Sequence, residues 1–255
     1  MPLPFAPASA LDALTSTGYA RLSPADLAGL AHQPLGALQA LQPAWDDLPP
    51  DAHLKDGGRY RRRRHGSLVW DAQQGVQPVP HRAHWQPTSY NALHGGMLRW
   101  FEPLQPALAD AGGFLALIDG LAALFTQAVQ ARPAPAGEPA FDGRWFIEAH
   151  AFRIDTEGGL GRPTPEGAHR DGVTYVAVLL VDRQGIVGAE TRVFEADGPQ
   201  GVRFTLTEPW SALLLDDARV IHESTPIQPA VPDTLGHRDT LVLTFRAQGF
   251  QDPPA

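Results

Sequence analysis

Residues 165–181 read PEGAHRDGVTYVAVLLV, and this stretch decides the fold class. Its first part, Pro165 to Gly172, is rich in turn-forming residues, and its second part, Val173 to Val181, is a run of apolar and β-branched residues. Such a run, following Gly and Asp, predicts a strand that is buried on both faces. His169 and Asp171 lie one residue apart just before that strand, and the period of two in extended chain places both side chains on one face.

The remainder of the C-terminal half continues the strand pattern. Further β-rich runs, separated by Gly, Pro and Asp, lie at Arg144–Ile154, Glu190–Glu195, Val202–Leu206, Ala212–Leu215, Arg219–His222 and Thr240–Phe245. Short strands at this spacing predict an antiparallel sandwich or barrel. We therefore expect a jelly roll over residues 141–250.

The N-terminal part carries helix signals instead. Residues 23–26 read SPAD, which combines a hydroxyl N-cap, a proline at the first helical position and an acid in the first turn. Residues 111–131 have apolar side chains at helical spacing and predict one long helix. We expect residues 1–140 to form a helical and mixed support region, which a loop at Ala131–Ala140 joins to the jelly roll. The predicted fold class is α+β, mostly β, with residues 1–255 in a single domain.

The strongest cluster of positive charge is RYRRRR at residues 59–64. One interpretation is a site for anions or nucleic acid. The other is a strand, Arg61 to Trp70, whose arginines alternate between solvent and internal carboxylates. The strand is favoured because Tyr60 is the one aromatic residue in the run, whereas single-stranded nucleic acid is bound by several stacking aromatics.

Composition and charge exclude several classes of function. The chain has 20 Lys and Arg residues against 28 Asp and Glu, a formal net charge of −8, which disfavours nucleic-acid binding. It has no cysteine, which excludes disulfides, thiolate metal sites and cysteine nucleophiles. Met1 to Leu11 lacks the basic start of a secretory signal, and no apolar run reaches the length of about 18 residues that a membrane span needs. We expect a cytoplasmic protein with neither a membrane nor a nucleic acid as partner.

The tripeptide His-Arg-Asp occurs twice, beginning at His169 and at His237. Two histidines and one carboxylate can bind Fe(II) and leave positions open for substrate and O₂. The first tripeptide has a downstream partner for such a set in His222, whereas His237 is the last histidine of the chain. We therefore predict that His169, Asp171 and His222 are the metal ligands and the catalytic centre.

An arginine follows at the start of the last predicted strand. The planar guanidinium of Arg238 is suited to hold a dicarboxylate through two charge-assisted hydrogen bonds. Arg246 lies further along the same strand with the same parity, and it is the alternative for this role.

The order of these motifs resembles a known family. PEGAHRDG, followed by VAVLLVDRQGIVGAETRVFE, LLDDARVIHESTPI and HRDTLVLTFR, resembles the Fe(II)/2-oxoglutarate-dependent dioxygenases. More narrowly, it is similar to the bacterial branch that contains hydroxylases of free L-isoleucine and related amino acids. The resemblance covers residues 144–246. It implies a double-stranded β-helix, Fe(II) at the three predicted ligands, and 2-oxoglutarate held by Arg238.

The resemblance also implies an activity. We expect hydroxylation of a small substrate by O₂, a free aliphatic amino acid or a derivative of one, with conversion of 2-oxoglutarate to succinate and CO₂. Thr191 could hydrogen-bond 2-oxoglutarate or serve only as a strand-forming residue. His150 could line the substrate pocket or be a hydrogen-bonded histidine of the core.

Two alternatives stay open at this point. The first is a cupin-like metal protein that does not use 2-oxoglutarate, in which Arg238 would have no cosubstrate to hold. The second is a non-catalytic module that binds anionic partners through Arg59–Arg64, and its binding would weaken steeply with added salt.

Overall fold

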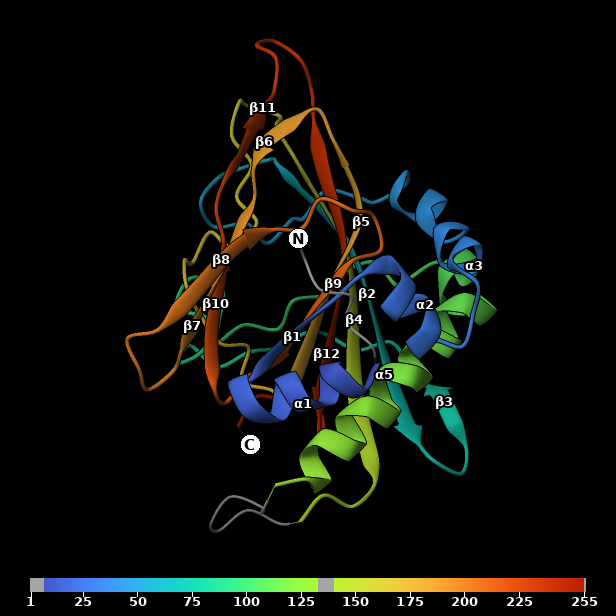
Figure 1. Cartoon of the computed structure of the whole chain (residues 1–255). Helices are drawn as coiled ribbons and strands as arrows, with labels where there is room; N and C mark the ends of the chain where they lie inside the picture. The colour runs from blue at the N-terminus through green and yellow to red at the C-terminus, as the bar shows by residue number, and fades with distance from the viewer. Residues whose placement is uncertain (1–6, 133–139, 255) are drawn as a thin grey trace.

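The computed structural model describes residues 7–132 and 140–254 (Figure 1). The start of the Met1–Leu11 segment and most of the predicted loop Ala131–Ala140 lie outside these residues. The helices are α1 (Pro7–Thr17), α2 (Pro24–Leu30), α3 (Leu35–Gln39), the 3₁₀ helix η1 (Gln42–Trp45), α4 (Pro106–Ala109) and α5 (Gly112–Gln130). Ser23 caps α2 as predicted, since its side chain accepts a hydrogen bond from the backbone N–H of Asp26 and the Asp26 carboxylate accepts one from the backbone N–H of Ser23.

The strands form one large and two small antiparallel sheets. They are β1 (Tyr19–Leu22), β2 (Arg61–Asp71), β3 (Gly75–Pro78), β4 (Arg144–Asp155), β5 (Tyr175–Gln184), β6 (Ile186–Gly188), β7 (Glu190–Glu195), β8 (Gly201–Thr205), β9 (Ala212–Asp216), β10 (Val220–Ser224), β11 (Ile227–Pro229) and β12 (His237–Arg246). The large sheet has the order β1-β9-β5-β12-β4-β2-β3, and the small sheets are β10-β7-β8 and β11-β6. The mostly β, jelly-roll prediction is confirmed. The first 140 residues add β1, β2 and β3 to the large sheet.

The large sheet lies between the helices and the small sheets (Figure 1). Successive side chains on a strand point to opposite faces, so each central strand serves two different environments. On β12, Leu241, Leu243 and Phe245 belong to the main apolar core, whereas Arg238 and Thr240 line a cavity. The helix-facing side of the sheet is therefore apolar. The opposite side combines the polar cavity wall with a second apolar cluster, which is formed by Val176, Val193, Leu213, Leu215 and Val220.

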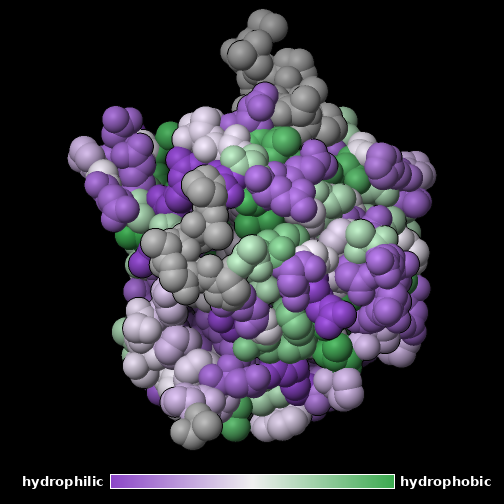
Figure 2. Space-filling view, turned by 90° about the horizontal axis from the view of Figure 1, so that it is seen from below, coloured by the Kyte–Doolittle hydropathy of each residue, from purple (hydrophilic) through white to green (hydrophobic). Residues whose placement is uncertain are grey.

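Helix α5 covers the apolar face. Its Phe125 stacks on Tyr175 of β5, with ring centroids 4.6 Å apart, and meets Phe245 of β12 edge-on at 4.9 Å. By length and composition α5 could cross a membrane, but half of that segment is buried inside the protein, as expected for a core helix. The face of the molecule seen from below is hydrophilic over most of its area, with apolar residues scattered between (Figure 2).

Strand β2 confirms the strand prediction for the arginine-rich run. Arg62 lies outside the barrel, where its Nε is 3.5 Å from the carboxylate of Asp155. Arg61 points inward, and its Nε donates to the buried carboxylate of Asp51 at 2.7 Å. The alternation explains how β2 can begin with four consecutive arginines. Arg61 and Arg63 face the interior, whereas Arg62 and Arg64 lie on the opposite face of the strand.

The packing of α5 on α2 predicts a sharp difference between two glycines. A Cβ at Gly120 would lie 2.1 Å from the backbone oxygen of Leu30, whereas a Cβ at Gly29 would meet nothing within 4 Å. We expect Gly120→Ala to destabilise the protein by about 1–3 kcal/mol through overpacking. Gly29→Ala, the matched control, should be neutral or stabilise by up to about 1 kcal/mol through helix propensity. Urea unfolding of both variants measures the difference, and equal stabilities would contradict the packing argument.

Candidate metal centre and its cavity

Backbone pairing brings the two predicted histidine ligands side by side. The backbone N–H of His169 donates to the carbonyl of His222 at 3.0 Å, and the reverse hydrogen bond has the same length. The two imidazole rings are 4.6 Å apart between centroids. A residue of the loop before β5 is thereby fixed against a residue of β10, although 53 positions separate them in the sequence.

The carboxylate of Asp171 completes a compact set of donor atoms. Its oxygens lie 3.7 Å from Nε2 of His169 and 3.8 Å from Nε2 of His222, and the three donor atoms all lie within 4.8 Å of one another. Nδ1 of His169 is 3.0 Å from the carbonyl oxygen of Gly167. Since a carbonyl can only accept, Nδ1 carries a proton, and Nε2, which faces Asp171, is the nitrogen that would bind a metal once it has lost its own proton. Two imidazoles and one carboxylate fit Fe(II) in composition and in size.

The electrostatics of these three side chains are strongly coupled. Burial alone disfavours protonation of His169, but its hydrogen bond to Asp171 and the charge of that carboxylate outweigh burial and raise the pKa to about 9. The pKa of Asp171 is lowered to about 2, because His169 outweighs the effect of burial. Burial and the charge of His169 lower the pKa of His222 to about 4. The carboxylate is therefore ionised and attracts a cation.

The buried carboxylate of Asp217 holds the loop that carries Asp171. The carboxylate of Asp217 accepts three backbone hydrogen bonds, from Asp171 at 2.9 Å, Gly172 at 2.7 Å and Val173 at 3.0 Å. Burial and the nearby charge of Asp171 raise the pKa of Asp217 to about 7. The sequence signal was weak, because a second aspartate after Asp216 is an ordinary turn residue.

The three donor side chains line a cavity between the large sheet and the small sheets. Its volume is about 130 Å³, which suits small molecules. The polar residues on its wall are Arg61, Arg63, His84, Gln86, Asn91, Arg99, Glu148, His150, Thr164, Glu166, His169, Asp171, His222, Ser224, Arg238, Thr240, Thr244 and Gln251. The cavity therefore contains guanidinium groups, carboxylates and imidazoles at close quarters.

The cavity distinguishes the two candidate arginines of β12. Arg238 is only 4% exposed and lines the cavity, and among the described residues it has neither a hydrogen-bond partner nor an ion pair for its guanidinium. Arg246 lies at the other end of the strand and lines a different depression beside Arg132 and Asp216. A buried cation without a counterion is costly, so the Arg238 position favours an anionic ligand.

One predicted residue, Thr191, lies elsewhere. Thr191 is buried on β7 opposite Ser224 of β10, but it does not line the cavity. Thr240, two residues after Arg238 on the same face of β12, does line it. The second His-Arg-Asp tripeptide is also apart from the metal centre, since Nε2 of His237 lies 3.4 Å from Asp182 and 3.5 Å from Asp239.

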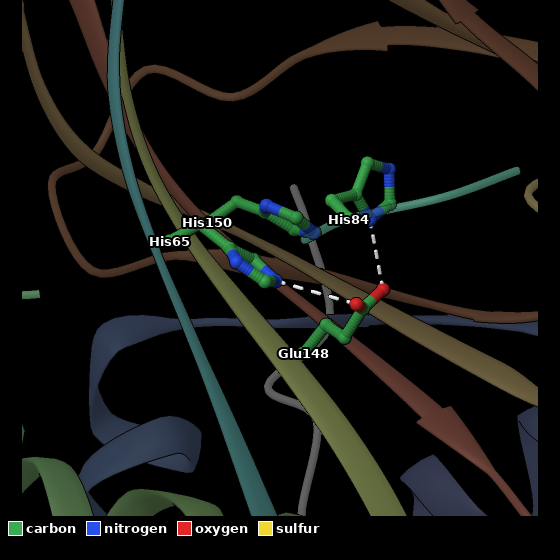
Figure 3. Close-up of side chains that lie close together, drawn as sticks. All are labelled: His65, His84, Glu148 and His150. Carbon is green, nitrogen blue, oxygen red and sulfur yellow. Dashed lines mark hydrogen bonds and ion pairs between the residues drawn. The ribbon is translucent and has the colours of Figure 1, made fainter. Parts of the chain in front are cut away.

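His150 belongs to a second group of side chains, shown in Figure 3, which consists of His65, His84, Glu148 and His150 and is called here the histidine–glutamate cluster. His65 of β2 pairs in register with His150 of β4, and their rings stack at 4.8 Å. The Glu148 carboxylate lies 2.9 Å from Nδ1 of His84 and 3.3 Å from Nε2 of His65. His150 lines the cavity, and its Nδ1 lies 2.7 Å from Nη2 of Arg63, so it combines the two roles considered for it.

Burial sets the protonation of this cluster. It lowers the pKa of His65 to about 4 and also lowers the pKa values of His84 and His150. The interactions with His84 and His65 outweigh burial at Glu148 and lower its pKa. At neutral pH the cluster therefore contains one carboxylate and three neutral imidazoles.

The comparisons with known proteins agree with this geometry. The sequence profile of the 2OG-Fe dioxygenases matches residues 42–244. A crystal structure of a bsmA homolog from Methylobium petroleophilum PM1 is 56% identical, covers 100% of this chain and 98% of its own, and superposes with a TM-score of 0.90. No curated protein sequence matches the chain.

Two more distant structures share the fold. The Fe(II)/(alpha)ketoglutarate-dependent dioxygenase TqaL has 19% identity and a TM-score of 0.70, with 94% of this chain and 86% of its own covered. IDO from Bacillus thuringiensis has 17% identity and a TM-score of 0.70, with 98% and 99% covered. Because the family profile spans most of the sequence, the chain belongs to the 2OG-Fe dioxygenase family, and its cofactors are Fe(II) and 2-oxoglutarate.

Proposed function

We propose that this enzyme oxygenates a free aliphatic amino acid or a close derivative, with Fe(II) bound by His169, Asp171 and His222 and 2-oxoglutarate anchored by Arg238. Bound Fe(II) and 2-oxoglutarate supply the reaction with O₂, in which 2-oxoglutarate is converted to succinate and CO₂ and one oxygen atom enters the substrate. We propose the cytoplasm as the location of the reaction, and the absence of cysteine is compatible with a reducing compartment.

The observation that carries the proposal is the unpaired guanidinium of Arg238 in the cavity of the His-Asp-His set. 2-Oxoglutarate has a carboxylate at each end. One end can chelate the metal while the other forms two parallel hydrogen bonds with the guanidinium. Thr240 follows on the same face of β12, and its hydroxyl could support this position in the role that was considered for Thr191.

The side chains around the metal centre supply orientation. Asp217 holds the backbone on which Asp171 is carried. Gly167 accepts from His169 and fixes its ring, so that Nε2 faces the other donors. Such outer contacts orient metal ligands and keep the donor atoms in a productive geometry before the metal binds.

The cavity wall supports a small substrate that carries charges of both signs. Arg63 and Arg99 are buried cations on the wall, and the Glu166 carboxylate lies there too, 3.6 Å from Nε2 of His169. A free amino acid has one carboxylate and one ammonium group, which these groups could pair. The small volume of the cavity argues in the same direction.

The test of the proposed function is a panel of free L-amino acids incubated with the enzyme, Fe(II), 2-oxoglutarate and ascorbate. Mass spectrometry should detect a gain of one oxygen in at least one aliphatic amino acid, with succinate formed in equal amount. Succinate formation with no amino acid oxidised would leave the dioxygenase in place and contradict the amino-acid substrate.

The metal ligands can be tested against an internal control. We expect His169→Ala, Asp171→Ala and His222→Ala each to lower bound iron at least tenfold and to abolish succinate release, because an open three-ligand site has no donor to spare. His237→Ala changes the other His-Arg-Asp tripeptide and should retain iron. Iron content after anaerobic reconstitution measures this. If only His237→Ala lost iron, the metal would belong to the second tripeptide and the assignment to His169 and Asp171 would be wrong.

The anchor for 2-oxoglutarate is tested by two arginine variants. Arg238→Gln should raise the dissociation constant of 2-oxoglutarate at least tenfold, because a carboxylate in a buried site loses its charged partner. Arg246→Gln, on the same strand but outside the cavity, should leave it unchanged. Titration of 2-oxoglutarate into the anaerobic Fe(II) protein, followed by the visible charge-transfer band, gives both values. The reverse pattern would make Arg246 the anchor.

Asp217 should contribute to iron affinity without touching the metal. In Asp217→Asn one carboxylate oxygen becomes an NH₂ group, which faces backbone N–H donors and cannot accept from them. We expect a several-fold loss of iron affinity. We also expect the free energy of unfolding to fall by about 1–3 kcal/mol, because buried backbone N–H donors lose their acceptor. Iron titration and thermal unfolding check the two effects. Unchanged iron affinity would show that the loop holds Asp171 in place without the hydrogen bonds to Asp217.

A further inference from the structure

Besides Arg238, the wall of the cavity contains three buried guanidinium groups, those of Arg61, Arg63 and Arg99, which we call the arginine wall. All three residues line the cavity and are at most 6% exposed. We infer that the arginine wall is the site that binds the carboxylate of the substrate, with Arg99 as its principal donor. This inference rests on the proposed function and adds the end of the substrate that is recognised and the groups that recognise it.

The arginine wall carries more positive charge than its own partners balance. Arg61 and Arg63 share one carboxylate, that of Asp51, at 2.7 Å and 3.9 Å. Arg99 has no carboxylate within ion-pair distance among the described residues, and its Nη2 donates to the neutral side chain of Gln86 at 3.0 Å. Unpaired buried cations are costly, and an anion bound beside them would remove much of that cost.

The three guanidiniums form a continuous surface because two phenylalanines lie between them. The guanidinium carbon of Arg63 lies 3.7 Å from the ring centroid of Phe101 and 4.4 Å from that of Phe152. Arg99 approaches Phe101 at 5.9 Å, and Arg61 approaches Phe152 at 6.0 Å. Cation–π contacts hold the guanidinium planes without neutralising them. The wall therefore keeps donors available for a ligand.

The histidine–glutamate cluster balances only part of this charge. Its one carboxylate, Glu148, acts to raise the pKa values of Arg63 and Arg99, which burial lowers, but among the described residues it forms an ion pair with neither. Glu148 is engaged by His84 and His65, and its Oε1 also lies 3.9 Å from Nη1 of Arg82. Nη2 of Arg63 donates to Nδ1 of His150 at 2.7 Å, so this imidazole acts as a neutral acceptor that orients the arginine. Figure 3 shows Glu148 joined to His65 and His84, with the ring of His150 beside that of His65.

The same contacts argue against a second metal ion in the cluster. Its four side chains offer donor atoms within 4.8 Å of one another, which is a metal-like spacing. However, the lone pair of His150 Nδ1 is already used by Arg63, and that guanidinium would repel a divalent cation placed beside it. The charges around the cluster favour an anion at its border and disfavour a cation inside it.

A polar bridge connects the arginine wall to the metal centre. Oε1 of Gln86 accepts from Arg99, and Nε2 of the same side chain lies 3.4 Å from a carboxylate oxygen of Asp171. Backbone hydrogen bonds of 2.9 Å in both directions also pair Arg99 with His84. A carboxylate bound by Arg99 would thus be held at a fixed short distance from the metal ligands, which is how a site selects the carbon that reacts.

The experiment uses the anaerobic enzyme loaded with Fe(II) and 2-oxoglutarate, whose visible band responds when a substrate binds near the metal. The probes are the standard L-amino acids, each beside its own primary carboxamide, which keeps the ammonium and side chain but has no carboxylate. We expect the visible band of the parent to respond to at least one amino acid. The affinity for the carboxamide of that amino acid should be at least about tenfold lower.

Arg99→Gln should weaken binding of the responding amino acid at least tenfold and leave its carboxamide unaffected, with Arg99→Lys in between. The affinity for 2-oxoglutarate should stay unchanged in both variants, which shows that they are folded and loaded. Arg62→Gln is the matched control, because Arg62 neighbours Arg61 and Arg63 on β2 but faces Asp155 outside the cavity.

Three results would overturn the inference. The first is that the parent binds carboxamides as well as amino acids, or responds to neither. The second is that Arg99→Gln binds the amino acid like the parent. The third is that the parent binds a second equivalent of metal, which His84→Gln removes. A parent that shows no visible band with 2-oxoglutarate would instead contradict the proposed cosubstrate site, so the two failures are distinguishable.

Discussion

Burial of the large sheet on both faces is the constraint on which the rest of this structure depends. A strand covered on one side by helices and on the other by the small sheets exposes neither face to water, so every side chain on it must find a partner inside the protein. On β4, Ile147, Ala149 and Ala151 belong to the apolar core, while Glu148 and His150 face the cavity. The pleat separates the two sets residue by residue, which lets a rigid core support a polar site with no loop in between.

The second feature of this interior is that its buried charges need hydrogen-bond partners and counterions inside the protein. Buried ionic groups are tolerated when their hydrogen bonds and counterions are supplied, and the cavity supplies most of them internally. Asp51 serves two arginines, Asp217 accepts from three backbone N–H groups, and Glu148 is engaged by two imidazoles. Among the described residues of the cavity wall, Arg238 and Arg99 remain without an ion pair, and this is where we propose that anionic ligands bind. The imbalance is local and coincides with the space for ligands.

The three parts of the cavity differ in the chemical groups that they offer to a ligand. The His-Asp-His set offers nitrogen and oxygen donors, the start of β12 offers one unpaired guanidinium, and the arginine wall offers several more around aromatic rings. Gln86 connects the last of these to the first through its two amide atoms. The 56% identical structure from Methylobium petroleophilum shares the fold over the whole chain, so it offers a second protein in which the same three parts can be compared.

The sequence by itself determined the local features: the apolar strands, the cap at Ser23, the alternation along β2, and the same-face spacing of His169 and Asp171. These depend on neighbours within a few residues, and a periodic pattern records them directly. Only the tertiary structure decided which distant groups meet. It placed Thr240 rather than Thr191 on the cavity wall and separated Arg238 from Arg246. It also brought loop residues such as Arg99 beside the metal centre, because contacts between loops and strands far apart in the chain depend on sheet order and register, which no short-range pattern contains.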